Sequence, residues 1–516
     1  MAAIGSILNR EQLRLAARWR RVGLVLSPGF AVAVWWLRPD NMSQPAAALM
    51  ALIAGTLVLW LTEALPLGIT ALAAPAFGVL LGVATPEAMF APFANPVVFL
   101  FLGAAFLNEA AQRRRLDRAV AAALFPQGRT TLRALVRSIS FVACVLSSFA
   151  PNGSVAALLV PVVTEPGKRF GLRFERLGLL GVAWCTNVGG MLTAVGAPAN
   201  LVALAALSQY DGRDVPLLYW TLISLPVVIA MVGLWMALLG LVLGPDGKAE
   251  VHGDLRTLPK AERRSPTTKA LRLAETVPAV FGLDRGQAVI AGVIAVCLLL
   301  WWAPGLVALV TGVGSAASVA TATALPPGVV ALLGAAVLFA APAGQKRNPY
   351  GKPVTEPVLS WAEAKNIDWD VVLLLGCGLA LGHQGIDTGL SRWLGHLAIK
   401  GMGVETQLGL AMLMATLTLI MTQLASDTVT AAVLCPLAVV AAQQINVSPI
   451  APCLSVGMAA SMAVLTPNAT DSSAIIFATS KLTWRQLAQR GVFALVAAAV
   501  LIPTLTTAVA ALLGLG

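Results

Sequence analysis

Two short polar clusters interrupt long apolar runs, and each carries side chains that can bind ions. The first is the pentapeptide APNGS around Asn152 and Gly153, and the second is the tetrapeptide ASDT around Asp427. The apolar runs beside each cluster are too short to cross a bilayer alone, so each cluster is predicted to be the tip of a helical hairpin. Irregular backbone inside a membrane persists only where protein or a watery cavity satisfies its polar groups. The two tips therefore predict one shared polar pocket.

The chemistry of these tips suits an anion and Na⁺. Each tip leads into an apolar helix, starting near Val155 and near Val429, whose unpaired amides and positive dipole end can hold an anion without a lysine. Two further interruptions, at about 196–200 and 466–468, offer backbone carbonyls and side-chain oxygens, which are hard ligands for Na⁺. One such motif alone is more often a kink or a packing site. Four paired motifs favour binding of a carboxylate or sulfate beside Na⁺.

Asp427 is the most informative single residue. An ionisable side chain inside an apolar segment costs roughly 2.5 to 3.5 kcal/mol on insertion scales, and such residues are usually functional. The alternative is a simple helix N-cap, because Asp before an apolar helix satisfies free amides. The two roles are compatible.

The elements that must position these tips are membrane helices. Hydrophobic residues form 58% of the 516 positions and charged residues only 11%, which excludes a water-soluble globular domain. About ten to twelve stretches approach the roughly 20 residues that a membrane helix needs. The runs do not alternate as barrel strands do, so the sequence predicts an all-α polytopic membrane protein.

Charge predicts orientation rather than a nucleic-acid partner. The net charge of +11 fits the excess of Lys and Arg in cytoplasmic loops of membrane proteins. A run of arginines precedes the first apolar stretch at about 22–37, namely Arg10, Arg14, Arg18, Arg20 and Arg21. The run predicts a protein of the cell inner membrane whose N-terminus lies in the cytoplasm. The predicted partners are membrane lipid and a small anionic substrate, with no nucleic acid and no organic cofactor.

An internal repeat divides the chain. The predicted parts are residues 1–44 (cytoplasmic N-terminus and first membrane helix), 45–244 (first half), 245–284 (cytoplasmic linker) and 285–516 (second half). Three blocks recur in the same order, namely those starting at Val97 and Val371, those ending at Pro161 and Pro436, and the tetrapeptides VGAP and VLTP. Repeated halves, often inverted across the membrane plane, are common in secondary transporters, which hold substrate where corresponding helices are interrupted.

At these tips the sequence resembles the divalent anion/sodium symporter family, the dicarboxylate, citrate and sulfate carriers of the ion transporter superfamily. That family carries a Ser-Asn-Thr hairpin signature in each half, and the corresponding triplets here are Pro151-Asn152-Gly153 and Ser426-Asp427-Thr428. The resemblance extends to LTEALPLGITALAAP, NVGGMLTAVGAPANL and WDVVLLLGCGLAL, and it covers most of the chain from about residue 50. It implies a homodimer of the elevator type, in which a transport domain with re-entrant hairpins and broken helices slides against a scaffold domain.

The resemblance also implies two Na⁺ sites with substrate between them. The first Na⁺ site is implied at Ser147, Asn152 and Gly196, and the second at Thr422, Ala425, Asp427 and Leu465. The implied substrate contacts are Asn152, Gly153, Ser154, Ala197, Asp427, Thr428, Thr466 and Pro467. The predicted function is Na⁺-coupled transport of small divalent anions of the C4-dicarboxylate class.

Several residues depart from the family pattern. Pro151 and Gly153 replace the usual serine and threonine, and Ala197 stands where many members have a hydroxyl. Asp427 replaces an asparagine, and a carboxylate beside a dianion repels it unless a proton or a cation neutralises it. A sodium-independent dicarboxylate exchanger, an H⁺-coupled carrier and a sulfate or citrate carrier therefore remain alternatives.

Other classes of function fit less well. A membrane enzyme needs a nucleophile with a base, or a metal set, at one depth, and no HExxH or GxSxG string occurs. A channel needs a continuous pore, whereas paired broken helices around one midplane site suit alternating access. The sequence therefore predicts a transporter and no catalytic residues.

Overall fold

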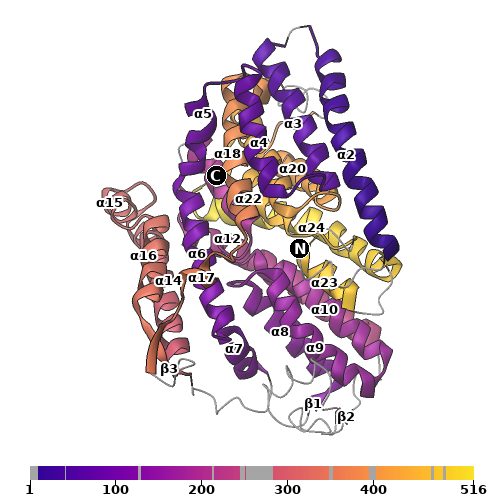
Figure 1. The fold of residues 1–516 in the computed structure, drawn as a ribbon, viewed down its shortest axis with the longest axis vertical. Coiled ribbons are helices and arrows are strands. Elements are labelled where there is room, and N and C mark those ends of the chain that lie inside the picture. Colours follow the sequence, from indigo (N-terminus) through magenta and orange to yellow (C-terminus); the bar gives the residue numbers. More distant parts are fainter. Residues whose placement is uncertain are drawn as a thin grey trace.

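The computed structural model describes residues 10–40, 42–125, 130–211, 214–243, 250–251, 283–347, 353–393, 403–466, 470–479 and 484–515. Most of these residues are helical (Figure 1). The predicted linker 245–284 lies mostly outside the described residues, except that β2 (Glu250–Val251) pairs antiparallel with β1 (Thr130–Thr131). A second strand pair joins β3 (Pro342–Arg347) to β4 (Pro353–Pro357). The fold is thus helical with two small strand pairs.

The helices described first along the chain are those that precede the first hairpin. They are α2 (Arg10–Trp36), α3 (Gln44–Thr62), α4 (Leu67–Leu80), α5 (Pro86–Phe90), the 3₁₀ helix η1 (Ala91–Ala94), α6 (Pro96–Arg113) and α7 (Leu116–Leu124). Local capping sets their starts: the Ser43 side chain accepts from the Ala46 amide before α3, and the Asn95 side chain accepts from the Val97 amide before α6. The first of these helices, α2, begins earlier than the apolar stretch at 22–37, since it also includes the arginines that precede that stretch.

The first polar cluster lies between two antiparallel helices. α8 (Leu132–Ser147) and α9 (Asn152–Phe170) form the predicted hairpin, and α10 (Leu172–Gly190), α11 (Pro198–Asp211) and α12 (Leu217–Leu243) follow. α8, α9 and α10 lie together at the lower end of the view in Figure 1.

The second half has a corresponding order of elements. It starts with α14 (Arg285–Thr311), α15 (Ala316–Ala324), α16 (Pro327–Ala340), α17 (Trp361–Ala364) and α18 (Trp369–Asp387). The second hairpin is α20 (Gln407–Met421) with α21 (Asp427–Gln444), followed by α22 (Ile450–Ala460), α23 (Asp471–Thr479) and α24 (Trp484–Leu512). Both halves thus place a hairpin before a helix that is interrupted and then resumes.

Length and composition separate spanning helices from re-entrant ones. Among the described residues seven helices are long and apolar enough to cross a membrane, or eight if the bent pair α5–η1 and α6 counts as one span. Four apolar helices are shorter: residues 67–80, 152–165, 407–421 and 450–460. Three of the four belong to the two hairpins or to the interrupted helix after the second hairpin, which explains why the sequence count of ten to twelve stretches exceeds the number of full spans.

Burial distinguishes the interior helices from the periphery. Of the spanning window in α21, 72% is buried inside the protein, against 28% for the windows in α14 and α24. Small residues allow close crossings: a Cβ built on Gly103 of α6 would lie 2.5 Å from the Ala331 Cβ of α16, so only glycine permits this approach. α21 is therefore an interior helix, while α14, α15 and α16, which lie at one side of the molecule in Figure 1, carry exposed apolar side chains.

Candidate functional site

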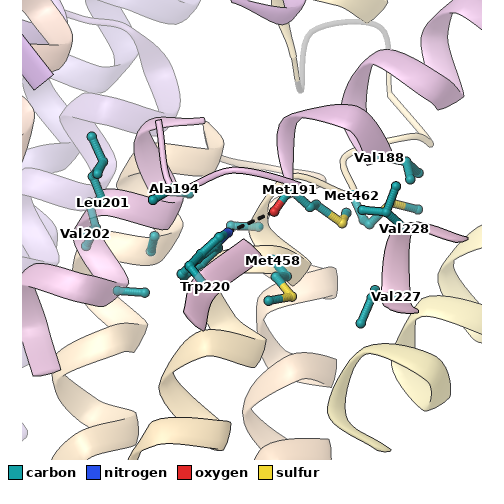
Figure 2. Close-up of a cluster of buried hydrophobic side chains, with 14 of the residues drawn as sticks. Val188, Met191, Ala194, Leu201, Val202, Trp220, Val227, Val228, Met458 and Met462 are labelled. Carbon is teal, nitrogen blue, oxygen red and sulfur yellow. Dashed lines mark hydrogen bonds between the residues drawn. The ribbon is translucent and has the colours of Figure 1, made fainter. Parts of the chain in front are cut away.

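The interruption between α10 and α11 is built by side chains that satisfy its backbone. Residues 191–197 leave the helical path, and the Trp220 indole N–H donates to the Met191 carbonyl at 2.9 Å (Figure 2). The Ser224 hydroxyl donates to the Leu192 carbonyl at 2.8 Å. Both donors belong to α12 and are fully buried. A non-helical segment at membrane depth is thereby paired within the protein.

Asn200 holds the same interruption from the α11 side. Its amide nitrogen donates to the Gly190 carbonyl at 2.8 Å and to the Thr193 carbonyl at 2.9 Å. The Thr193 hydroxyl in turn donates to the Ser148 carbonyl at the hairpin tip. The α8–α9 tip and the α10–α11 break are therefore one hydrogen-bonded unit.

The predicted residues of the first ion site lie together in this unit. The Ser147 hydroxyl donates to the Asn152 side-chain carbonyl, across the tip. A Cβ built on Gly190 would lie 2.9 Å from that Asn152 oxygen and 3.4 Å from the Gly196 carbonyl oxygen. Only glycine at 190 leaves room between them. Ser147, Asn152 and Gly196 thus bring hydroxyl, amide and backbone oxygens to one small space, which is a donor set that suits Na⁺.

The predicted substrate contacts of the first half differ in their surroundings. Ser154, on the first turn of α9, donates its hydroxyl to the Gln112 side chain of α6 at 3.1 Å. Gly153 faces α23, because a Cβ built there would lie 2.7 Å from the Asp471 Cβ. Ala197 is buried with 2% exposure, and its carbonyl accepts from the Asn200 amide. Gly153 therefore faces α23 of the second half, whereas Asn152 is bonded to Ser147 within its own hairpin and Ser154 is bonded to a neighbouring helix.

The interruption after α22 is satisfied mainly by Gln423. Its side-chain nitrogen donates to the Leu419 carbonyl at 2.9 Å and the Met462 carbonyl at 3.0 Å, and its side-chain oxygen accepts from the Val464 amide at 3.1 Å and the Leu465 amide at 2.9 Å. Gln423 is 8% exposed, so its four side-chain hydrogen bonds are made away from water. One buried amide thus links the second hairpin tip to the second break.

Three further side chains tie the second break in place. The Thr422 hydroxyl donates to the Ala460 carbonyl at 2.6 Å, and the Thr466 hydroxyl donates to the Gln423 carbonyl at 2.9 Å. Asn187 of α10 donates to the Ala463 carbonyl at 3.3 Å and accepts from the Ser472 hydroxyl at 2.9 Å. The contacts of Asn187 join the first half to the second at the level of the breaks.

Asp427 turns toward its own helix. Its carboxylate accepts from the Thr428 amide at 2.7 Å and from the Thr428 hydroxyl at 3.1 Å, while the Ser426 side chain accepts from the Val429 amide at 3.3 Å. The second tip was expected to offer unpaired amides to an anion, but its own side chains occupy them. Asp427 therefore serves as a cap in this structure, and it also places a negative charge at the tip.

The structure thus brings together only some of the predicted site residues. The first ion set lies together. In the second set, Thr422 and Leu465 are joined through the Gln423 segment, while the hydrogen bonds of Asp427 within the described chain go to Thr428. Ala425 is buried beside Asp427, and Pro467 lies outside the described residues. Sequence reasoning missed Gln423, Asn187 and Trp220, whose signal was a polar or indole side chain within an apolar segment. Asn200 fell within the predicted interruption at 196–200, but its role as a donor to the Gly190 and Thr193 carbonyls was not predicted.

The fold is that of a multi-pass membrane protein in which two hairpin tips are bonded to two interrupted helices. The family model of the sodium:sulfate symporter transmembrane region matches residues 18–515, so the chain belongs to this family. Membership confirms the expected family and excludes an enzyme, because the family and the matched relatives are transporters.

Curated relatives agree with this assignment, and two solved structures share the fold. The chain is 24% identical over 485 residues to a sodium-dependent dicarboxylate transporter, SdcS, of Staphylococcus saprophyticus, covering 91% of this chain and 87% of the relative. SdcS of a Staphylococcus aureus strain is 22% identical over 495 residues, with 93% and 89% coverage. MtrF of Neisseria gonorrhoeae, an antimetabolite efflux pump, has a TM-score of 0.52 at 14% identity, covering 92% of this chain and 97% of its own. The Alcanivorax borkumensis transporter YdaH has a TM-score of 0.51 at 14% identity, with 83% and 88% coverage.

Proposed function

We propose that the protein is a secondary active transporter that carries small divalent anions of the C4-dicarboxylate class together with Na⁺. The observation that carries the proposal is the first ion set, in which Ser147, Asn152 and Gly196 converge at a break that side chains of α11 and α12 hold by hydrogen bonds. Sodium dependence and dicarboxylate transport are properties of SdcS, a relative along most of the chain.

The two Na⁺ sites differ in strength of support. The first site uses the Ser147 hydroxyl, the Asn152 amide oxygen and the Gly196 backbone. The second uses Thr422, Ala425, Asp427 and the backbone at Leu465, with Gln423 as the residue that fixes the Leu465 segment. The substrate lies between the tips, in reach of Asn152, Gly153, Thr428 and Thr466, and Pro467 belongs to the same set by sequence.

The transport cycle follows the elevator scheme. The hairpins, α10, α11, α22 and α23 form the moving domain, and α6 and α18 belong to the scaffold. The Ser154–Gln112 bond joins the two at 3.1 Å and has to break when the hairpin moves. The protein works as a homodimer in the inner membrane, with its N-terminus in the cytoplasm. Exposed apolar side chains on α14, α15 and α16 support a surface for lipid or a second copy; Val310, Val319 and Leu333 are examples.

A proton-coupled carrier is the second candidate, favoured by one observation. Asp427 stands where the family has an asparagine, and a protonated carboxylic acid resembles the amide more closely than a carboxylate does. Uptake that rises with an inward proton gradient in the wild type, and loses that response in Asp427→Asn, would support this candidate. An unchanged pH response in the variant would exclude it.

Uptake by proteoliposomes tests the proposal. Labelled succinate is supplied under an inward Na⁺ gradient, an inward proton gradient, or internal unlabelled succinate without a gradient. Uptake with Na⁺ alone supports the symporter, and uptake that needs only internal succinate identifies an exchanger. Silence in all three conditions refutes the dicarboxylate assignment, and sulfate and citrate are the next solutes to supply.

A further inference from the structure

Asn187 lies near the end of α10 and bonds to two separate parts of the second half. Its side-chain nitrogen donates to the Ala463 carbonyl at 3.3 Å, and its side-chain oxygen accepts from the Ser472 hydroxyl at 2.9 Å. Ala463 lies just after α22, and Ser472 lies in the first turn of α23. One amide of the first half therefore bridges the two ends of the interruption between α22 and α23.

The bridged segment carries two of the residues that the sequence predicts as ligands. Leu465, of the second ion set, and Thr466, a substrate contact, lie between the two points that Asn187 holds. The Leu465 amide donates to the Gln423 side chain and the Thr466 hydroxyl donates to the Gln423 carbonyl, both at 2.9 Å. These bonds hold the segment against the second hairpin. The bonds of Asn187 hold it against α10 of the first half.

Both hydrogen bonds of Asn187 are made away from water. Asn187 and Ser472 are 0% exposed, and Thr470 and Ser473 beside them are also buried. The Thr470 hydroxyl accepts from the Ser473 amide at 3.2 Å and lies 3.0 Å from the Ser472 hydroxyl, which fixes the start of α23. Solvent cannot easily replace a hydrogen bond lost in such a place. Truncation of Asn187 should therefore loosen the segment at both of its ends.

The same turn of α10 belongs to the first ion set. Gly190 follows Asn187 by less than one helical turn, and a Cβ built on it would lie 2.9 Å from the Asn152 side-chain oxygen. The Gly190 carbonyl also accepts from the Asn200 side chain at 2.8 Å. The end of α10 is thus in contact with the first ion set through Gly190 and with the second interruption through Asn187.

We propose that Asn187 is a positioning residue for the solute. By holding Ala463 and Ser472, it keeps Thr466 in place for binding, and it attaches the second interruption to the helix end that adjoins the first ion set. This inference rests on the proposed function, because it takes the solute to bind at the second interruption. Loss of Asn187 weakens solute binding, whereas the first Na⁺ site keeps its own ligands.

Uptake kinetics separate this role from a merely structural one. Labelled succinate uptake is measured in proteoliposomes under an inward Na⁺ gradient, over a range of succinate concentrations. We expect Asn187→Ala to raise the half-saturating succinate concentration about tenfold and to keep the maximal rate within about twofold of the wild type. Thr186→Ala is the matched control and should keep both values, because the buried Thr186 hydroxyl bonds within α10, to the Val182 carbonyl at 2.8 Å.

Two further variants test the bridge itself. Ser472→Ala removes the partner of the Asn187 oxygen and should also raise the half-saturating succinate concentration. The double variant Asn187→Ala/Ser472→Ala should do little more than Asn187→Ala alone, because both substitutions break the same hydrogen bond. Asn187→Ser, whose side chain is too short to reach both partners, takes the place of Asn187→Ala if that variant fails to fold.

Thermal unfolding of purified protein gives a readout besides uptake. Na⁺ in place of choline should raise the unfolding midpoint of Asn187→Ala as it does in the wild type, because the first ion set is intact. Succinate added with Na⁺ should raise the midpoint further in the wild type and in Thr186→Ala, and much less in Asn187→Ala.

The outcomes distinguish this inference from the proposed function. A wild-type half-saturating concentration in folded Asn187→Ala or in Ser472→Ala overturns the inference and leaves the proposed function standing. A fall in the maximal rate alone, an equal effect of Thr186→Ala, or fully additive effects of Asn187→Ala and Ser472→Ala also overturn it. Absence of succinate uptake by the wild type overturns the proposed function, and this inference with it.

Discussion

Gln423 offers the sharpest perturbation of the second break. Gln423→Leu keeps nearly the same volume but removes all four side-chain hydrogen bonds, which reach from Leu419 to Leu465. Hydrogen bonds contribute about 0.6 kcal/mol each in membrane proteins and up to about 1.5 in soluble ones, so the loss should be roughly 2 to 6 kcal/mol. These hydrogen bonds stabilise the segment that carries the second ion site. When they are lost, local opening of that segment competes directly with Na⁺ binding.

Two measurements read this effect. In purified protein the midpoint of thermal unfolding should fall, and in proteoliposomes the Na⁺ concentration for half-maximal uptake should rise by roughly thirtyfold or more, since each 1.4 kcal/mol is about tenfold. Gln444→Leu is the matched control, because Gln444 lies on the same hairpin and donates one exposed hydrogen bond, to the Arg392 carbonyl at 2.9 Å. If Gln423→Leu behaves like Gln444→Leu in both assays, Gln423 does not hold the break and the reasoning is refuted.

Three other perturbations test the first half. Ser147→Ala should raise the Na⁺ concentration for half-maximal uptake about tenfold. Ser148→Ala should not, because the Ser148 hydroxyl donates to the Cys144 carbonyl one turn earlier at 2.9 Å. Equal effects of the two substitutions would exclude Ser147 as a Na⁺ ligand. Gly190→Ala should abolish Na⁺-driven uptake by displacing Asn152, while Gly233→Ala, with open space around it, should be tolerated; active Gly190→Ala would contradict the crowded site. Trp220→Phe leaves the Met191 carbonyl without its hydrogen-bond donor and should destabilise the protein by about 1 to 3 kcal/mol in thermal unfolding. The loss should exceed that of Trp369→Phe, whose indole hydrogen bond is exposed. Equal unfolding midpoints for the two variants would show that the Trp220 bond does not stabilise the interruption after α10.

Much of the fold could be predicted from the sequence because membrane insertion dictates it. Apolar length predicts helices, and the polar clusters at Asn152 and Asp427 mark the two hairpin tips that α8–α9 and α20–α21 form. Local caps such as Asn95 before α6 follow from residue type alone. These features depend on residues that are close in sequence, so short-range patterns are enough to predict them.

What could not be predicted depends on long-range contacts. Gln423 stands next to a predicted ligand, Thr422, yet nothing in its surroundings says that its oxygen accepts from amides 41 and 42 residues later. The β1–β2 pair joins the first half to the linker region in the same way. Asp427 was weighed as a cap or a ligand, and only the direction of its carboxylate toward Thr428 shows the capping contact. Gly153 looks like a lost hydroxyl in sequence, whereas the structure places the Asp471 side chain in that space.

The central claim is that Na⁺ and a C4-dicarboxylate bind together at the first tip. The most direct measurement is the thermal unfolding midpoint of purified protein with succinate added, in Na⁺ and in choline, for the wild type, Asn152→Ala and Ser148→Ala. We expect a rise in the midpoint that needs both Na⁺ and solute, that persists in Ser148→Ala and that is lost in Asn152→Ala. A rise of equal size in choline, or one that Asn152→Ala retains, would contradict it.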